Sequence, residues 1–196
     1  LTSLQSNVSD RPAVDADVAV ARADAAWEAG RIDVARAHLQ RALTLNPPLH
    51  VDRAAHVKLA ALEDPIRGPA VRAWFSDRAE DVKLLIVLDA LERSPNDPYL
   101  NYLLGRRLTR TAPNMAVPRL SRALQGELPE AIRREAYRLK IEANYLAGDC
   151  SAVEHDVGAL PDLGPAFALS AREWVERCQF EARTWNGPLV PDAAFR

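Results

Sequence analysis

Apolar residues recur every three or four positions along most of the chain, which is the spacing of an α-helix. Between residues 33 and 45, Ala35, Leu39, Ala42 and Leu43 lie on one helical face. The same spacing predicts further helices over about 10–29, 50–62, 77–93, 98–109, 129–147 and 165–183. No stretch alternates apolar and polar residues as a half-buried strand does. The pattern therefore predicts an all-α fold.

The phase of these helices also predicts which side chains are buried. The predicted core residues are Ala35, Leu39, Ala42, Leu88, Leu91, Leu104, Leu120 and Leu124.

Proline and glycine mark where the predicted helices begin and end. Asp97 followed by Pro98 is typical of a capping residue and the first helical position, and Pro129 and Pro165 repeat this start signal. Residues 63–76 contain two prolines and a glycine and leave room only for a short helix. We therefore expect an irregular insertion at 63–76.

Residues 25–47, AAWEAGRIDVARAHLQRALTLNP, predict one helix, a turn and a second helix. Gly30 can adopt the left-handed conformation that ends the first helix. Ala35 and Ala42 allow two helices to approach closely, and Pro47 prevents the second helix from continuing. In these features the segment resembles part of a tetratricopeptide repeat.

Related pieces recur further along the chain. Ala42-Leu43 returns as Ala90-Leu91 and as Ala123-Leu124, at intervals of 48 and 33 residues. The second interval is close to the roughly 34-residue period of tetratricopeptide repeats, and the first contains the insertion. Tyr102-Leu103-Leu104-Gly105 resembles the first-helix signature of the family.

The resemblance implies a right-handed α-α superhelix of about three irregular helix-turn-helix repeats plus capping helices. We expect a polar N-terminal segment over residues 1–11 and a single tetratricopeptide-like domain over 12–196.

In tetratricopeptide arrays the first helix of each repeat lines a groove that binds a partner protein or peptide. Aligned through Gly105, the resemblance implies a protein-binding groove at Tyr99, Tyr102, Arg106 and Arg110. Two further alignments, through Gly30 and Gly148, add Val20, Asp24, Trp27, Arg138, Glu142 and Tyr145. The alternative for each aromatic residue is packing between neighbouring repeats. The arginines could pair with acidic residues of a partner.

Charge and hydropathy narrow the classes of partner. The formal net charge is -2, with 27% charged residues, so no global basic charge favours nucleic acid or an anionic membrane. The longest apolar run, Leu84 to Leu88, is far too short to span a bilayer. We therefore expect neither nucleic-acid binding nor membrane insertion by this segment.

No residue pattern in the sequence indicates catalysis. His50 and His56 are six residues apart and fall on opposite sides of a helix, which argues against a metal site. Glu127, Glu130 and Glu135 are interpreted as a solvated helix face. Phosphate-binding glycine loops and nucleophile elbows are missing from the sequence. We expect no catalytic, cofactor-binding or metal-binding residues.

Cys150 and Cys178 are too far apart for a Cys-x-x-Cys motif. They could be two buried thiols of the core. Alternatively, they could form a disulfide across an antiparallel helical hairpin, since helices of about 9 and 13 residues would bring them level. A disulfide implies an oxidising compartment. With the start at Leu1 in place of Met, this favours a bacterial periplasmic or extracellular-facing location.

Two functions fit these observations. The first is a non-catalytic scaffold or adaptor that binds a partner protein in the groove. The second is a regulatory or sensor domain excised from a longer signalling or membrane protein.

Overall fold

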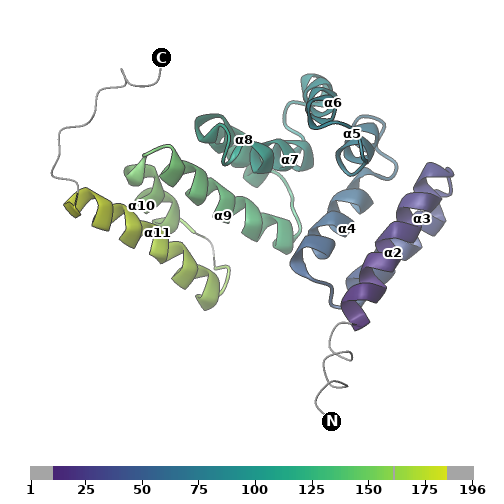
Figure 1. The fold of residues 1–196 in the computed structure, drawn as a ribbon, viewed down its shortest axis with the longest axis horizontal. Helices are drawn as coiled ribbons and strands as arrows, with labels where there is room; N and C mark the ends of the chain where they lie inside the picture. The colour runs from purple at the N-terminus through teal and green to yellow at the C-terminus, as the bar shows by residue number, and fades with distance from the viewer. Residues whose placement is uncertain (1–10, 161, 185–196) are drawn as a thin grey trace, which may run out of the picture.

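The computed structural model describes residues 11–160 and 162–184, and this part of the chain folds into helices without a strand (Figure 1). The ten helices are α2 (Arg11–Glu28), α3 (Ile32–Thr44), α4 (Leu49–Ala61), α5 (Arg67–Trp74), α6 (Glu80–Arg93), α7 (Pro98–Leu108), α8 (Pro113–Gln125), α9 (Glu130–Leu146), α10 (Cys150–Gly158) and α11 (Pro165–Thr184). The predicted all-α class is confirmed. Residues 1–10 of the expected polar segment lie outside the described residues.

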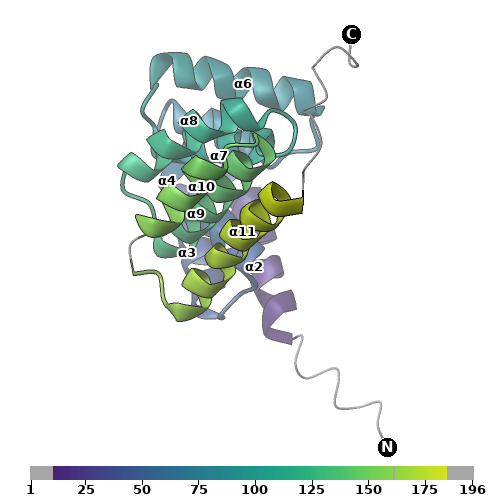
Figure 2. The ribbon, with the colours of Figure 1, turned by 90° about the vertical axis from the view of Figure 1, so that its left-hand side faces the viewer.

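The helices follow one another through the molecule, from α2 and α3 at one end to α10 and α11 at the other (Figure 1). Each helix packs against its neighbours in the chain. Additional contacts join α9 to α4, α7 and α11, so α9 is a central element of the array. Figure 2 views the array from the α11 end and shows α6 along one edge.

Several helix ends follow the local signals in the sequence. Gly30 has φ +70°, the left-handed conformation expected after the first helix. The Asp97 side chain accepts a hydrogen bond from the Leu100 backbone N–H at 2.9 Å and so caps α7. The start of α6 differs from its prediction near residue 77. The Ser76 hydroxyl donates to the carbonyl of Ala73 and not to the new helix, which begins at Glu80.

Most of the predicted core is confirmed. Six of the eight predicted residues are buried: Ala35, Leu39, Ala42, Leu91, Leu104 and Leu120. Leu88 and Leu124 are only partly buried, although both pack against the core. In α6 the buried residues are Val87, Ala90 and Leu91, so the helix is rotated slightly from the predicted phase.

Residues 63–76 contain α5, which belongs to the main core. Ala70 and Val71 are fully buried there, and the helix contacts α4, α6 and α7. The short helix expected within 63–76 thus begins at Arg67 and is an integral layer of the array.

The last two helices form a smaller core of their own against α9. Its buried residues are Ile141, Val153, Ala171 and Cys178. The structure joins Cys150 and Cys178 in a disulfide, with a Cα–Cα distance of 5.6 Å. The bridge links the start of α10 to α11, as the hairpin geometry allowed.

Candidate functional site

A hollow of about 630 Å³ opens between α7 and α9, and we call it the α7–α9 hollow. The ends of α5 and α6 complete its wall. Its lining residues are Trp74, Phe75, Glu80, Arg106, Arg107, Thr109, Arg110, Thr111, Glu135, Arg138, Leu139 and Glu142.

The hollow unites groove positions that the resemblance assigned to two different helices. Arg106 lies in the last turn of α7 and Arg110 in the turn just after its end, and Arg138 and Glu142 lie one helical turn apart on α9. Arg110 Nε donates to Glu142 Oε1 at 3.0 Å, which joins the two helices across the hollow.

Tyr102 lies beneath the hollow and not on its surface. Its side chain is 1% exposed, and its hydroxyl donates to Glu135 Oε2 at 2.5 Å. Burial, followed by the negative charge of Glu135, raises the pKa of Tyr102 well above its usual value. The phenol therefore stays neutral and links α7 to α9. Because the side chain is buried, the prediction that Tyr102 contacts a partner is wrong.

Tyr99 lies outside the hollow. Its ring is half-buried and carries the guanidinium of Arg67 at 4.9 Å from the ring centroid, in a cation–π contact. Arg67 is also paired with Asp97, at 2.6 Å between Nη2 and Oδ2. Tyr99 therefore packs between neighbouring helices, which is the alternative that the sequence left open.

Two buried carboxylates form the floor of the hollow. Counted as whole residues, Glu135 and Glu142 are 7% and 5% exposed, so the interpretation of Glu135 as part of a solvated face is wrong. Glu135 Oε2 lies 2.5 Å from Arg53 Nε on α4, although the Nε–H group makes no hydrogen bond within the described part of the chain. A sequence signal existed, because Glu135 and Glu142 are seven residues apart and flank Leu139 on the apolar face.

A second, smaller hollow of about 210 Å³ lies between α2, α4 and α5. Lys58 is 4% exposed there, and its Nζ lies 2.6 Å from Asp24 Oδ1. Trp27 is also buried and lines this hollow. Phe75 lines both hollows. Val20 packs against the core instead.

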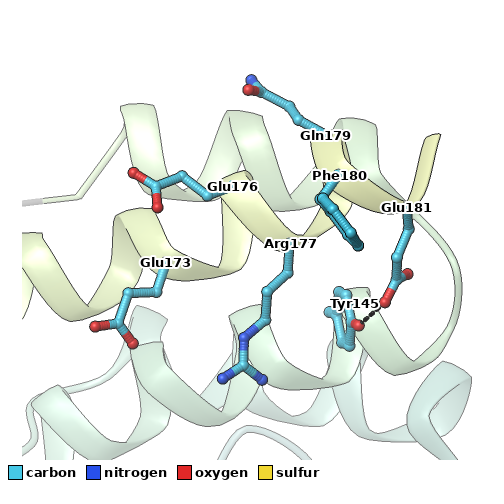
Figure 3. A pocket seen from close by; sticks show the side chains of 7 residues that line it. All are labelled: Tyr145, Glu173, Glu176, Arg177, Gln179, Phe180 and Glu181. Atoms are coloured by element: carbon cyan, nitrogen blue, oxygen red, sulfur yellow. Dashed lines mark hydrogen bonds between the residues drawn. The ribbon is translucent and has the colours of Figure 1, made fainter. Parts of the chain in front are cut away.

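Tyr145 lies at a third hollow of about 760 Å³ beside α11 (Figure 3). Its hydroxyl donates to Glu181, and its ring packs against Trp174 at a centroid distance of 5.1 Å. The other lining residues all belong to α11: Glu173, Glu176, Arg177, Gln179, Phe180 and Glu181. This surface is one flank of α11 with a single residue of α9, whereas residues of four helices and their ends build the α7–α9 hollow.

The described residues, 11–160 and 162–184, contain neither a cluster of metal-ligating side chains nor a membrane-spanning helix. Within them, three or more histidine, cysteine or acidic side chains never gather as a metal site would require. The described helices also include none with the length and apolar character needed to cross a bilayer.

Comparisons of the chain with protein-family models, with curated proteins and with solved structures give no match.

Proposed function

We propose that this chain is a non-catalytic adaptor of the tetratricopeptide-like kind, which binds an extended segment of a partner protein in the α7–α9 hollow. The observation that carries the proposal is the meeting of Arg106, Arg110, Arg138 and Glu142 in one hollow. These residues come from α7, with the turn after it, and from α9. The resemblance assigns α7 and α9 to two repeats and places both helices in the binding groove.

The spacing of polar pairs between helices also supports a repeating architecture. Three pairs join helices that would be the first helices of neighbouring repeats. These pairs are Asp24 with Lys58, Tyr102 with Glu135 and Arg110 with Glu142, separated by 34, 33 and 32 residues. The separations are close to the roughly 34-residue period of tetratricopeptide repeats.

The lining of the α7–α9 hollow has the character of a protein-binding surface. Phe75 is 36% exposed and Trp74 is partly exposed, so an apolar wall stands beside the arginines. Aromatic and arginine side chains are enriched among the residues that contribute most to binding between proteins.

A steric block tests this proposal without changing the charge of the surface. Thr111 is exposed at the edge of the hollow, and its hydroxyl donates to the carbonyl of Arg107. Thr44 is a matched control, because it is exposed at the end of α3 and its hydroxyl donates to the carbonyl of Arg41, about one turn earlier.

In affinity capture from the organism that encodes the chain, we expect Thr111→Trp to lose a protein that the wild type and Thr44→Trp both retain. Circular dichroism and thermal melting would check that both variants are folded. Equal capture by the two variants would contradict a binding site in this hollow.

A further inference from the structure

The accessible lining of the α7–α9 hollow is more basic than the balance of its ionisable residues suggests. Four arginines and three glutamates line it, which is a difference of one charge. The arginine side chains are between 42% and 81% exposed, whereas those of Glu135 and Glu142 are 6% and 7% exposed. Glu80 is the one well-exposed glutamate of the lining, at 59%. A ligand that enters the hollow therefore meets four exposed arginines and one exposed carboxylate.

Two of these arginines are held by the floor of the hollow. Glu142 accepts a hydrogen bond from Arg110 at 3.0 Å on Oε1 and another from Arg138 at 2.8 Å on Oε2. Both carboxylate oxygens of Glu142 are thus used to position guanidinium groups.

The other two arginines are only loosely paired. The Nε of Arg106 lies 3.9 Å from Glu135 Oε1, and the Nε of Arg107 lies 3.7 Å from Glu80 Oε2. Both distances exceed that of a hydrogen bond. The Oε2 atom of Glu135 already receives the Tyr102 hydroxyl. Arg106 and Arg107 therefore have planar N–H donors available for an added carboxylate.

We propose that the segment bound in the α7–α9 hollow is acidic. Aspartate or glutamate side chains of the partner accept hydrogen bonds from Arg106 and Arg107, and an apolar side chain of the same segment lies against Trp74 and Phe75. This inference rests on the proposed function. Discrete carboxylates fit better than a nucleic-acid backbone, because Glu135 and Glu142 in the floor oppose a dense row of phosphates.

The test begins with a displayed library of short random peptides, selected on the intact chain. Selected peptides are synthesised in their original form and with every Asp and Glu replaced by Asn and Gln. Fluorescence anisotropy then measures their affinity for the wild type, Arg106→Gln, Arg107→Gln and Thr111→Trp. Arg93→Gln is the control, since Arg93 is an exposed arginine of α6 that does not line the hollow.

We expect the selected peptides to be rich in Asp and Glu, and we expect their affinity for the chain to fall as the salt concentration is raised. Arg106→Gln and Arg107→Gln should each lower the affinity about ten-fold or more, and Arg93→Gln should leave it unchanged. The neutralised peptides should lose affinity for the wild type by a similar factor.

Some selected peptides could fail to bind Thr111→Trp and yet bind the wild type equally well in their neutralised form. This result would overturn the acidic specificity, but it would still support binding in the α7–α9 hollow. A failure to recover any peptide sensitive to Thr111→Trp would contradict the proposed function itself. Tighter binding of a single-stranded oligonucleotide than of any acidic peptide would also overturn the inference.

Discussion

The Tyr102 hydroxyl on α7 donates to Glu135 Oε2 on α9 at 2.5 Å, and both side chains are buried. Arg53 on α4 contacts the same oxygen, so one carboxylate connects three helices that are distant in the chain. Since a buried charge is tolerated only when it is paired, this cluster fixes how α4, α7 and α9 lie together beneath the arginines.

Removing the carboxylate should therefore destabilise the protein. We expect Glu135→Ala to lower the free energy of unfolding by about 3 kcal/mol, because Arg53 loses its buried counter-charge and Tyr102 its acceptor. Glu130→Ala is the control. The Glu130 side chain is 66% exposed, and its one ion pair among the described residues is with Arg134 one turn away, so its loss should cost no more than about 0.5 kcal/mol. Urea denaturation measures both values, and equal losses would contradict a special role for Glu135.

The same link predicts a loss of stability at high pH. Burial and the charge of Glu135 raise the pKa of Tyr102, so the unfolded chain releases the phenol proton at lower pH than the folded protein. The contribution of Tyr102 should be complete below about pH 10, the pKa of an unperturbed tyrosine, and should decline as the pH rises further. The stability difference between the wild type and Tyr102→Phe, measured by denaturation across this range, should accordingly shrink above pH 10. A constant difference would show that the phenol is not buried in its neutral form.

Gly105 permits the close approach of α7 and α8. A Cβ atom at this position would lie 2.6 Å from Leu120 Cγ and 3.3 Å from the Leu120 backbone nitrogen. Leu120 is fully buried and cannot move aside cheaply. We expect Gly105→Ala to cost about 1–3 kcal/mol despite the better helix propensity of alanine. Gly158→Ala in α10, where a Cβ would meet open space, should cause no measurable loss of stability. Thermal melting of both variants measures the difference.

The disulfide should stabilise the C-terminal hairpin in particular. The bridge spans 28 residues, which corresponds to about 3.5 kcal/mol in the loop-entropy account. Replacing Cys150 and Cys178 by serine should speed hydrogen exchange in α10 and α11, whose core with α9 is small, and leave α2–α5 unchanged. Rapid alkylation of both cysteines in the native, unreduced protein would contradict the bridge.

Local signals in the sequence predicted much of the fold. Gly30 and Asp97 each act through backbone atoms within a few residues, so their roles could be inferred from the sequence alone. The arginines of the hollow could be found because helical phase places Arg106 and Arg110 on one face.

Helical phase also places Glu135 and Glu142 beside Leu139 on the apolar face, but it could not predict which residues pair with them there. Glutamate is a residue type that usually lies at the surface. The burial of Glu135 depends on Arg53 and Tyr102, which come from two other helices. Tyr102 is buried for the same reason, because its hydroxyl donates to Glu135 on another helix. Tyr99 similarly depends on Arg67, from a segment that the sequence indicated only as an irregular insertion.

Site-specific cross-linking tests the binding hollow most directly. A photo-reactive benzoylphenylalanine is introduced at Thr111 in one protein and at Thr44 in another, and each is irradiated in an extract of the organism that encodes the chain. We predict that the probe at Thr111, and not at Thr44, becomes bonded to one partner protein, and that mass spectrometry places the bond within an acidic segment of that partner. Equal labelling from both positions, or adducts from Thr44 alone, would contradict a partner-binding site in the α7–α9 hollow.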